Sequence, residues 1–280
     1  MIILKGDPKW AYRDPACFYH NGIYHLFFTV SERSEGYLCN RIGMSTSIDL
    51  SNWSEPRFLT ERNKLLNFSS PGNVIEHNGE FILCITSYPM PEPYEKHPWA
   101  DETARLFIMR TKNFVDFSSP EQLYPKGDTE NSLLGRMIDP YILKDNDEFK
   151  LFFKQNGVSL SVSRDLVHWD YKGHVQGGEN ACVIKKDNKF ILIHSPSNGI
   201  GFMESDDLVS WRDIGQTTLK QDEWEWAKGR ITAGFVLEAP DEFSYKYILF
   251  FHGSSDDNPE THGYASLALA FSDDLKTFVY

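Results

Sequence analysis

The chain has 280 residues, of which 41% are hydrophobic and 24% are charged, a composition that supports a sizeable packed core and argues against disorder. Lys and Arg number 28 against 40 Asp and Glu, a net charge of −12 that repels phosphate backbones and argues against nucleic acid as a partner. No apolar run approaches the ~20 residues of a membrane span. Charged residues follow Met1–Leu4 at once, so no signal peptide and a cytoplasmic location are expected. The four cysteines form no CxxC and are predicted to be buried free thiols.

Five hairpins are predicted along the chain, each with a strand, a polar turn and a second apolar strand. The first spans residues 14–28 and turns at Asn21-Gly22, the strongest short-range signal for a two-residue hairpin turn. The second turns in the same way at Asn78-Gly79. The remaining three turn near residues 145–147, near residues 187–188, and in a longer connection between residues 237 and 247.

A shorter element follows each hairpin, in which a Ser or Thr precedes polar residues, an apolar residue and then an aromatic one. After the aromatic comes a short outer strand, such as residues 57–59 in the first repeat. The last repeat leaves no room for such a strand before Tyr280, so residues 1–4 are predicted to supply it and to close a ring. The five copies of the element lie at residues 45–53, 111–117, 163–169, 205–211 and 272–278.

Five copies of this two-part pattern in 280 residues give about 56 residues for each repeat, enough for four short antiparallel strands with their loops. That is the unit of a β-propeller blade, and helical periodicity is nearly absent. The predicted fold class is therefore all-β, with residues 1–280 forming one five-bladed β-propeller of four-stranded antiparallel blades. A β-sandwich is the alternative.

Equivalent positions on the first strands of the blades face one another across the central channel of a propeller. The hairpins at residues 14–28 and 139–153 have the same length without a gap, and both open with Asp-Pro. Three acidic residues fall at the aligned position, where converging carboxylates repel one another and raise at least one pKa, as acid–base chemistry requires. These three are the candidate catalytic residues. The ring of five aligned positions is Asp14, Ser70, Asp139, Glu179 and Thr232.

Residues two positions before the ring are expected to share its face and to form the rim of a pocket. Arg230, at the rim, is expected to anchor a hydroxyl or a carboxylate of a substrate, or else to form an ion pair between blades. Trp226 is expected to stack on a sugar ring or to pack in the protein. His252 is expected to point inward from a second strand or to be a core histidine. The candidate substrate contacts are Tyr12, Phe68, Ser70, Met137, Trp226, Arg230, Thr232 and His252.

These motifs resemble those of the five-bladed β-propeller glycoside hydrolases, most closely glycoside hydrolase family 43, together with the related families 32 and 62. The resemblance rests on Arg-Asp-Pro at residues 13–15, Ile-Asp-Pro at residues 138–140, Glu179 with Val-Ile-Lys after it, and the Ser-x-Asp-Leu-x-x-Trp repeats. It implies a general base in blade 1, an Asp in blade 3 that tunes the pKa of the acid and positions it, and a general acid in blade 4. Those roles fall on Asp14, Asp139 and Glu179.

The first functional hypothesis is an inverting, exo-acting glycosidase on arabinofuranosyl or xylosyl residues of plant or microbial glycans. Its substrate is an oligosaccharide or glycoside, and no nucleic-acid or membrane partner is expected. Inversion needs two carboxyl groups about 6.5–9.5 Å apart. The alternatives are a retaining fructosidase-like hydrolase with Asp14 as nucleophile, with carboxyls about 5–5.5 Å apart, and a non-catalytic glycan-binding propeller. No Cys/His metal cluster is present and no cofactor is required, while the channel has room for Ca²⁺ or another cation. No particular oligomeric state is predicted.

Overall fold

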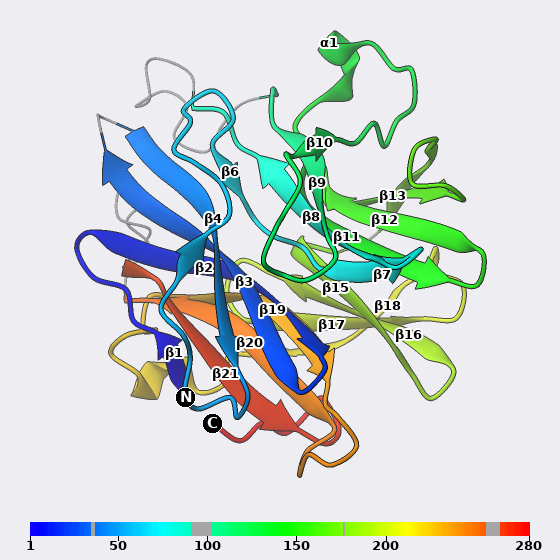
Figure 1. Cartoon of the computed structure of the whole chain (residues 1–280). Coiled ribbons are helices and arrows are strands. Elements are labelled where there is room, and N and C mark those ends of the chain that lie inside the picture. The colour runs from blue at the N-terminus through cyan, green and yellow to red at the C-terminus, as the bar shows by residue number, and fades with distance from the viewer. Residues whose placement is uncertain (35–36, 91–101, 176, 256–263) are drawn as a thin grey trace.

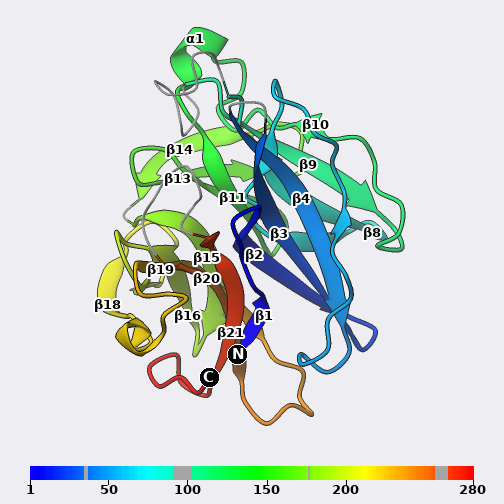
Figure 2. The same cartoon turned by 90° about the vertical axis from the view of Figure 1, so that its left-hand side faces the viewer.

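The computed structural model describes residues 1–34, 37–90, 102–175, 177–255 and 264–280. Five separate antiparallel sheets are arranged around a common centre, which makes the chain a five-bladed β-propeller (Figures 1 and 2). The predicted all-β fold and the number of blades are therefore confirmed. Among the residues described, no helix has the length and apolar character needed to cross a membrane.

Blade 1 follows the predicted hairpin closely. Its turn, Asn21-Gly22, has φ values of 50° and 80°, the left-handed values that a type I′ turn requires. Its second and third strands have 12 and 11 residues, more than their counterparts in the other blades, and this extra length later forms one wall of the site. The blade contains β2 (Trp10–His20), β3 (Ile23–Ser34), β4 (Tyr37–Ser47) and β5 (Arg57–Phe58).

Blade 2 departs from the predicted four strands, because its inner strand is divided into two short pieces that both pair with the same neighbour. The break falls at residues 70–73 and includes Ser70, the predicted ring residue of this blade. The blade contains β6 (Phe68–Ser69), β7 (Val74–His77), β8 (Glu80–Ser87), β9 (Arg105–Thr111) and β10 (Glu121–Gln122).

Blades 3 and 4 have the predicted four strands each, and short helical turns follow β10 and β18. All four cysteines of the chain are buried free thiols, as predicted. Blade 3 contains β11 (Ile138–Asp145), β12 (Glu148–Lys154), β13 (Val158–Ser163) and β14 (Asp170–Val175). Blade 4 contains β15 (Glu179–Lys186), β16 (Lys189–Ser195), β17 (Ile200–Ser205) and β18 (Arg212–Thr217). The helical turns are α1 (Asn131–Leu134) and the 3₁₀ turn η2 (Gln221–Glu223).

Blade 5 is completed by the other end of the chain, as predicted. Strands β19 (Arg230–Glu238), β20 (Tyr247–Ser254) and β21 (Ser266–Ser272) come from the C-terminal part, and β1 (Ile2–Leu4) pairs antiparallel with β21 as the outer strand. The amide of Leu269 donates to the carbonyl of Met1 over 2.9 Å. Figure 2 shows β1 lying alongside β21, so the two ends of the chain close the ring together.

Deleting residues 1–4 is expected to lower Tm by several degrees. The deletion removes the backbone bonds to β21 and the contacts of Ile3 and Leu4 with the core, and each lost kcal/mol lowers Tm by about 2–4 °C in chains of 150–250 residues. Scanning calorimetry measures the shift. A variant with serine at both Ile3 and Leu4, which keeps the backbone pairing, separates packing from hydrogen bonding. An unchanged Tm after deletion would show that closure contributes nothing.

The recurring Ser-x-Asp-Leu-x-x-Trp element is a structural turn. In its first copy the Ser47 hydroxyl accepts the amide of Leu50 over 2.9 Å, and the carboxylate of Asp49 accepts the amide of Asn52 over 2.8 Å. These amide bonds hold the pKa of Asp49 well below its usual range. The apolar residue adopts positive φ, between 56° and 65°, and is buried in every copy. The repeat therefore has a structural role, and the candidate catalytic residues lie on the inner strands. The five buried residues are Leu50, Phe114, Leu166, Leu208 and Leu275.

Candidate active site

Each inner strand carries a bulge at the same place. In blade 1, Arg13 pairs with Thr29 and Ala16 pairs with Phe27, which leaves two residues of the inner strand opposite one of its partner. The first bulged residue of every blade has positive φ, between 45° and 54°, a conformation that Asp and Asn adopt more readily than most residues. A bulge bends the strand and redirects its side chains. The five residues at this position are Asp14, Ser70, Asp139, Asn180 and Ala233.

This fivefold position corrects the predicted ring in blades 4 and 5. Glu179 pairs with Ser195, as Arg13 pairs with Thr29, so Glu179 stands one residue before the bulge. Thr232, which pairs with His252, stands at that same earlier place in blade 5. The sequence contains a signal of this offset. The spacing from Glu179 to the turn of blade 4, at residues 187–188, is one residue longer than the spacing from Asp14 to the turn Asn21-Gly22.

A hydrogen bond between neighbouring blades fixes most of these bulges. The amide of Ser70 donates to the hydroxyl of Thr29 over 2.7 Å, and the amide of Asp14 donates to Nδ1 of His252 over 3.1 Å. The predicted substrate contact His252 is thus 2% exposed and supports the backbone of Asp14. The amides of Asp139 and Ala233 donate in the same way to Thr86 and Ser195.

Blade 3 is the exception to this pattern. The accepting place on its second strand is occupied by Lys154, which pairs with Ile138 and has no group that can accept an amide. The amide of Asn180 donates instead to the Asp139 carboxylate over 3.4 Å. Lys154 Nζ lies 3.5 Å from Glu179 Oε1, and the two side chains are 23% and 41% exposed. A lysine at this place therefore puts a positive charge beside the candidate acid, which the sequence alone did not indicate.

The inner ends of the blades surround a pocket of about 420 Å³, within the size range of small-molecule sites. Asp14, Asp139 and Glu179 all line it, so the register error did not separate the three predicted carboxyls. The predicted contacts Ser70, Arg230 and Thr232 line it as well. The long strands of blade 1 and the segment after β8 supply one wall, with Ser31, Leu38, Asn40, Tyr88 and Met90. The lining is completed by Arg13, Thr29, Ser69, Arg136, Ile138 and Asn180.

Five predicted contacts are not among the lining residues: His252, described above, and four larger aromatic or apolar residues. Phe68 is 5% exposed and Met137 is 0% exposed in the hydrophobic core. The ring of Tyr12 packs edge-on against Phe28 at 5.9 Å. Trp226 stacks on Trp224, with ring centroids 5.4 Å apart. The predicted rim is therefore wrong for Tyr12, Phe68 and Met137, while Trp226 packs in the protein, the second of the two roles expected for it.

The bulge explains why the rim was misplaced. Counting back two residues from Asp14 or Asp139 assumes strict alternation of side chains, but a bulged residue with positive φ breaks that alternation. The consecutive residues Arg13 and Asp14 both line the pocket, and so do Ile138 and Asp139. The residue two before Ile138 is Arg136, which lines the pocket where Met137 was expected.

Asp14 is held by hydroxyl groups. Its carboxylate accepts the hydroxyl of Thr29 over 2.9 Å and lies 3.4 Å from that of Ser70, and the residue is 8% exposed. Nδ1 of His252 lies 3.8 Å from the other carboxylate oxygen. These contacts orient Asp14 toward the pocket, and no Lys or Arg ion pair to it is present among the described residues.

Asp139 is the carboxyl whose protonation is most altered. Burial, the charge of Glu179 and the charge of Asp14 together raise its pKa from 3.8 to about 7, while Ser70 and Arg136 act in the opposite direction. A carboxyl that shares its site with two others ionises reluctantly, because like charges repel in a poorly solvated volume. The convergence of the three carboxyls therefore raises at least one pKa, as expected from the sequence, and the raised pKa is that of Asp139.

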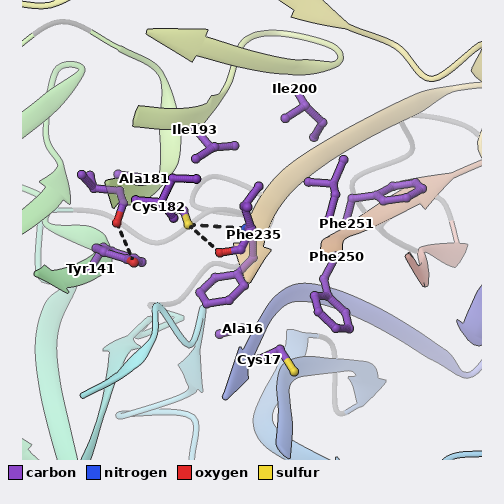
Figure 3. Close-up of a cluster of buried hydrophobic side chains, with 14 of the residues drawn as sticks. Ala16, Cys17, Tyr141, Ala181, Cys182, Ile193, Ile200, Phe235, Phe250 and Phe251 are labelled. Carbon is purple, nitrogen blue, oxygen red and sulfur yellow. Dashed lines mark hydrogen bonds between the residues drawn. The ribbon is translucent and has the colours of Figure 1, made fainter. Parts of the chain in front are cut away.

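Apolar residues close the channel beneath the carboxyls. The first paired residue after the bulge is buried in four blades, and Figure 3 shows these side chains gathered where the blades meet. The Tyr141 hydroxyl donates to the carbonyl of Val183 over 2.9 Å. Within the described ranges, no group of three or more His, Cys, Asp or Glu is placed to hold a metal ion. The cation in the channel stays a prediction, and no chemical step is derived through it. The four buried residues are Ala16, Tyr141, Cys182 and Phe235.

This propeller, with acidic side chains at the inner ends of its blades, has the fold of glycoside hydrolases of family 43 whose structures are solved. An exo-1,5-α-L-arabinanase from a bovine ruminal metagenomic library is 14% identical with a TM-score of 0.65, over 96% of each chain. A family-43 enzyme from Xanthomonas citri in complex with xylose is 11% identical with a TM-score of 0.64, over 99% of this chain and 93% of that one.

A family-43 β-1,3-galactosidase with galactodeoxynojirimycin is 13% identical with a TM-score of 0.66, over 99% of this chain and 97% of that one. No family model and no curated protein sequence matches the chain. At these identities the comparisons show that the fold is shared. The three enzymes are named for, or hold, different sugars, so the shared fold is compatible with several substrates.

Proposed function

We propose that the chain is an inverting, exo-acting glycoside hydrolase. The observation that carries the proposal is the convergence of Asp14, Asp139 and Glu179 on one pocket, with the pKa of Asp139 raised to about 7. Acid–base catalysis needs several carboxyls at one point. A structural role does not need them, since their mutual repulsion destabilises the fold. The solved propellers of the same fold, named as glycosidases with xylose or a galactose analogue bound, support the same class.

In the proposed mechanism, Asp14 removes a proton from the attacking water and Glu179 protonates the leaving oxygen. Asp14 suits the role of base because hydroxyl donors orient its carboxylate and no neighbouring lysine or arginine among the described residues competes for it. Glu179 is the most exposed of the three, at 41% for its side chain, and so faces the side from which a leaving group departs. Asp139, which is 5% exposed and has a raised pKa, accepts the amide of Asn180, the residue that follows Glu179, and so positions the acid.

The proposed substrates are arabinofuranosyl or xylosyl glycosides from plant or microbial glycans. A panel of nitrophenyl glycosides of both anomeric configurations tests this proposal, with product configuration followed by NMR during the first turnovers. Inverted product supports the assigned base and acid, whereas retained product favours the fructosidase-like alternative with Asp14 as nucleophile. Absence of hydrolysis across the panel and with oligosaccharides would contradict the proposed activity.

One contact favours a second candidate, a propeller that binds glycan without cleaving it. The Lys154–Glu179 ion pair stabilises the charged form of the residue that must be protonated to act as an acid. Replacing Lys154 by methionine separates the two candidates. In a hydrolase, the variant is expected to change kcat/KM on natural glycosides more than on nitrophenyl glycosides, since the lost charge lies beside the residue that protonates the leaving oxygen.

Lys150→Met is the matched control, because Lys150 lies on the same strand and pairs with Glu148 outside the pocket. It is expected to leave kcat/KM unchanged on both classes of glycoside. Equal kcat/KM values for wild type and Lys154→Met on natural glycosides would show that the ion pair does not affect the acid. A glycan-binding protein would show sugar binding in calorimetry with no turnover in either variant.

A further inference from the structure

The pocket is lined by as many arginines as carboxyls. Arg13, Arg136 and Arg230 come from blades 1, 3 and 5. A neutral sugar is recognised through hydroxyl groups, for which amide and hydroxyl side chains suffice. Guanidinium groups are the preferred partners of carboxylates, because their planar donors match the two oxygens. A pocket lined by three guanidinium groups therefore suits a ligand that carries a carboxylate.

Arg230 is the member with unused hydrogen-bonding capacity. Its Nε is buried without a partner, and a terminal nitrogen donates to the hydroxyl of Thr232 over 3.5 Å. Within the described part of the chain it takes part in no ion pair. A buried donor without an acceptor destabilises a protein. A ligand that brings an acceptor to this place would relieve that cost, so Arg230 is arranged for a bound group.

The other two arginines also contact neighbours. Arg136 donates to the hydroxyl of Tyr88 and lies 5.2 Å from the centre of its ring, and its charge partly counters the raised pKa of Asp139. Nε of Arg13 lies 3.5 Å from Nε2 of His252. These contacts hold two guanidinium groups at the pocket wall while the groups still line the pocket.

The positions of Arg136 and Arg230 are related by the fold. Arg136 stands two residues before Ile138, and Arg230 stands two residues before Thr232, which are equivalent places on blades 3 and 5. The inner strand of blade 4, which begins at Glu179, lies between those two blades. Arg136 and Arg230 thus stand on the two blades that flank the blade of the candidate acid, and all three residues line the same pocket.

We propose that the pocket takes a sugar that carries a single carboxylate, a uronic acid, with Arg230 as its principal partner. The inference rests on the proposed function. A uronic acid of the glucose series is a xylosyl ring with a carboxylate added at carbon 5, so it extends the proposed substrate class by one charged group. The single charge fits better than a phosphate ester with up to two charges, because Asp14, Asp139 and Glu179 line the same pocket and repel a dianion more strongly.

Binding is tested by calorimetry on the wild-type protein with glucuronate, its methyl ester and xylose. Glucuronate is expected to bind at least about tenfold more tightly than the methyl ester, which lacks the negative charge and carries one added methyl group. Arg230→Gln is expected to weaken glucuronate binding about 10- to 100-fold, the effect of losing a hydrogen bond to a charged group, and to weaken xylose binding by a much smaller factor. Arg164→Gln, an exposed arginine outside the pocket, is the control and is expected to bind all three as wild type does.

Turnover of nitrophenyl glucuronides and xylosides separates this inference from the proposed function. Cleavage of xylosides with no preference for glucuronides and no charge-dependent binding would overturn the inference and keep the hydrolase. Charge-dependent binding of glucuronate with no cleavage of either class would keep the carboxylate site and overturn the hydrolase. Equal or tighter binding of inorganic phosphate or of a sulfated sugar would show a general anion site and would also overturn the uronic acid assignment.

Discussion

Glu179→Gln is expected to lose activity in proportion to how poorly the leaving group departs. Glutamine cannot donate a proton to the leaving oxygen, so kcat/KM on natural glycosides should fall by about 10²–10⁴-fold, the usual contribution of general acid–base catalysis. Nitrophenyl glycosides, whose phenolate leaves without protonation, should retain a large part of the activity. Kinetics on a series of aryl glycosides of graded leaving-group pKa measure this contrast directly.

Asp14→Asn is expected to lose activity in a different pattern from Glu179→Gln. Asparagine cannot activate water, so activity should fall by a similar factor on every substrate, good and poor leaving groups alike. The positive φ of Asp14, 50°, is tolerated by asparagine, so the fold should be preserved. Glu225→Gln, a surface change outside the pocket, is the control. An equal loss for Glu179→Gln on all leaving groups would require the roles to be reassigned, and full activity in Asp14→Asn would contradict the proposed hydrolase.

Asp139→Asn is expected to stabilise the protein at neutral and alkaline pH. In the unfolded chain Asp139 has the ordinary pKa of 3.8, and in the fold its pKa is raised to about 7. Folding therefore favours the protonated form, and this contribution is fully present below pH 3.8 and lost as the pH rises through 7. Asparagine cannot ionise, so the variant escapes a loss on the order of 4 kcal/mol, at about 1.36 kcal/mol for each pKa unit.

Tm measured from pH 4 to pH 8 tests this prediction. The Tm difference between Asp139→Asn and wild type should be small near pH 4 and should widen in favour of the variant up to about pH 7. Asp145→Asn, at the turn of the same blade, is the control and should show no such widening. A constant Tm difference across the range would contradict the raised pKa. Lower activity together with higher stability in Asp139→Asn would show that the charge which destabilises the fold is also a charge that activity requires.

Most of the fold follows from local sequence signals. The Asn-Gly turns and the Ser-x-Asp-Leu-x-x-Trp elements each specify a local conformation, with positive φ at Gly22 and Leu50 for example. Five copies in order are enough to give the number of blades. The closure by residues 1–4 followed from counting strands in the last repeat, and it is confirmed because β21 otherwise lacks an outer partner.

The site was predicted less completely, for two physical reasons. The three carboxyls were found because they stand out by type, even though Glu179 was aligned one residue away from its true place. Their neighbours were missed because a bulge at Asp14 and Asp139 reverses the expected alternation, so Arg136 faces the pocket and Met137 faces the core. The contact of Lys154 with Glu179 joins two blades and leaves no local pattern to detect.

The joining of the two chain ends in one blade has a consequence for synthesis. Among the strands described, β1 is made before the others, whereas β21, with which it pairs, begins at Ser266 and is made last. The other four blades can therefore form before blade 5 can close the ring. Once β21 has been made, and until β1 pairs with it, its edge presents free amides and carbonyls, which the β1 of another molecule can also satisfy. Concentrated refolding therefore favours strand exchange between copies and domain-swapped dimers, whereas dilute or co-translational folding favours closure within one chain.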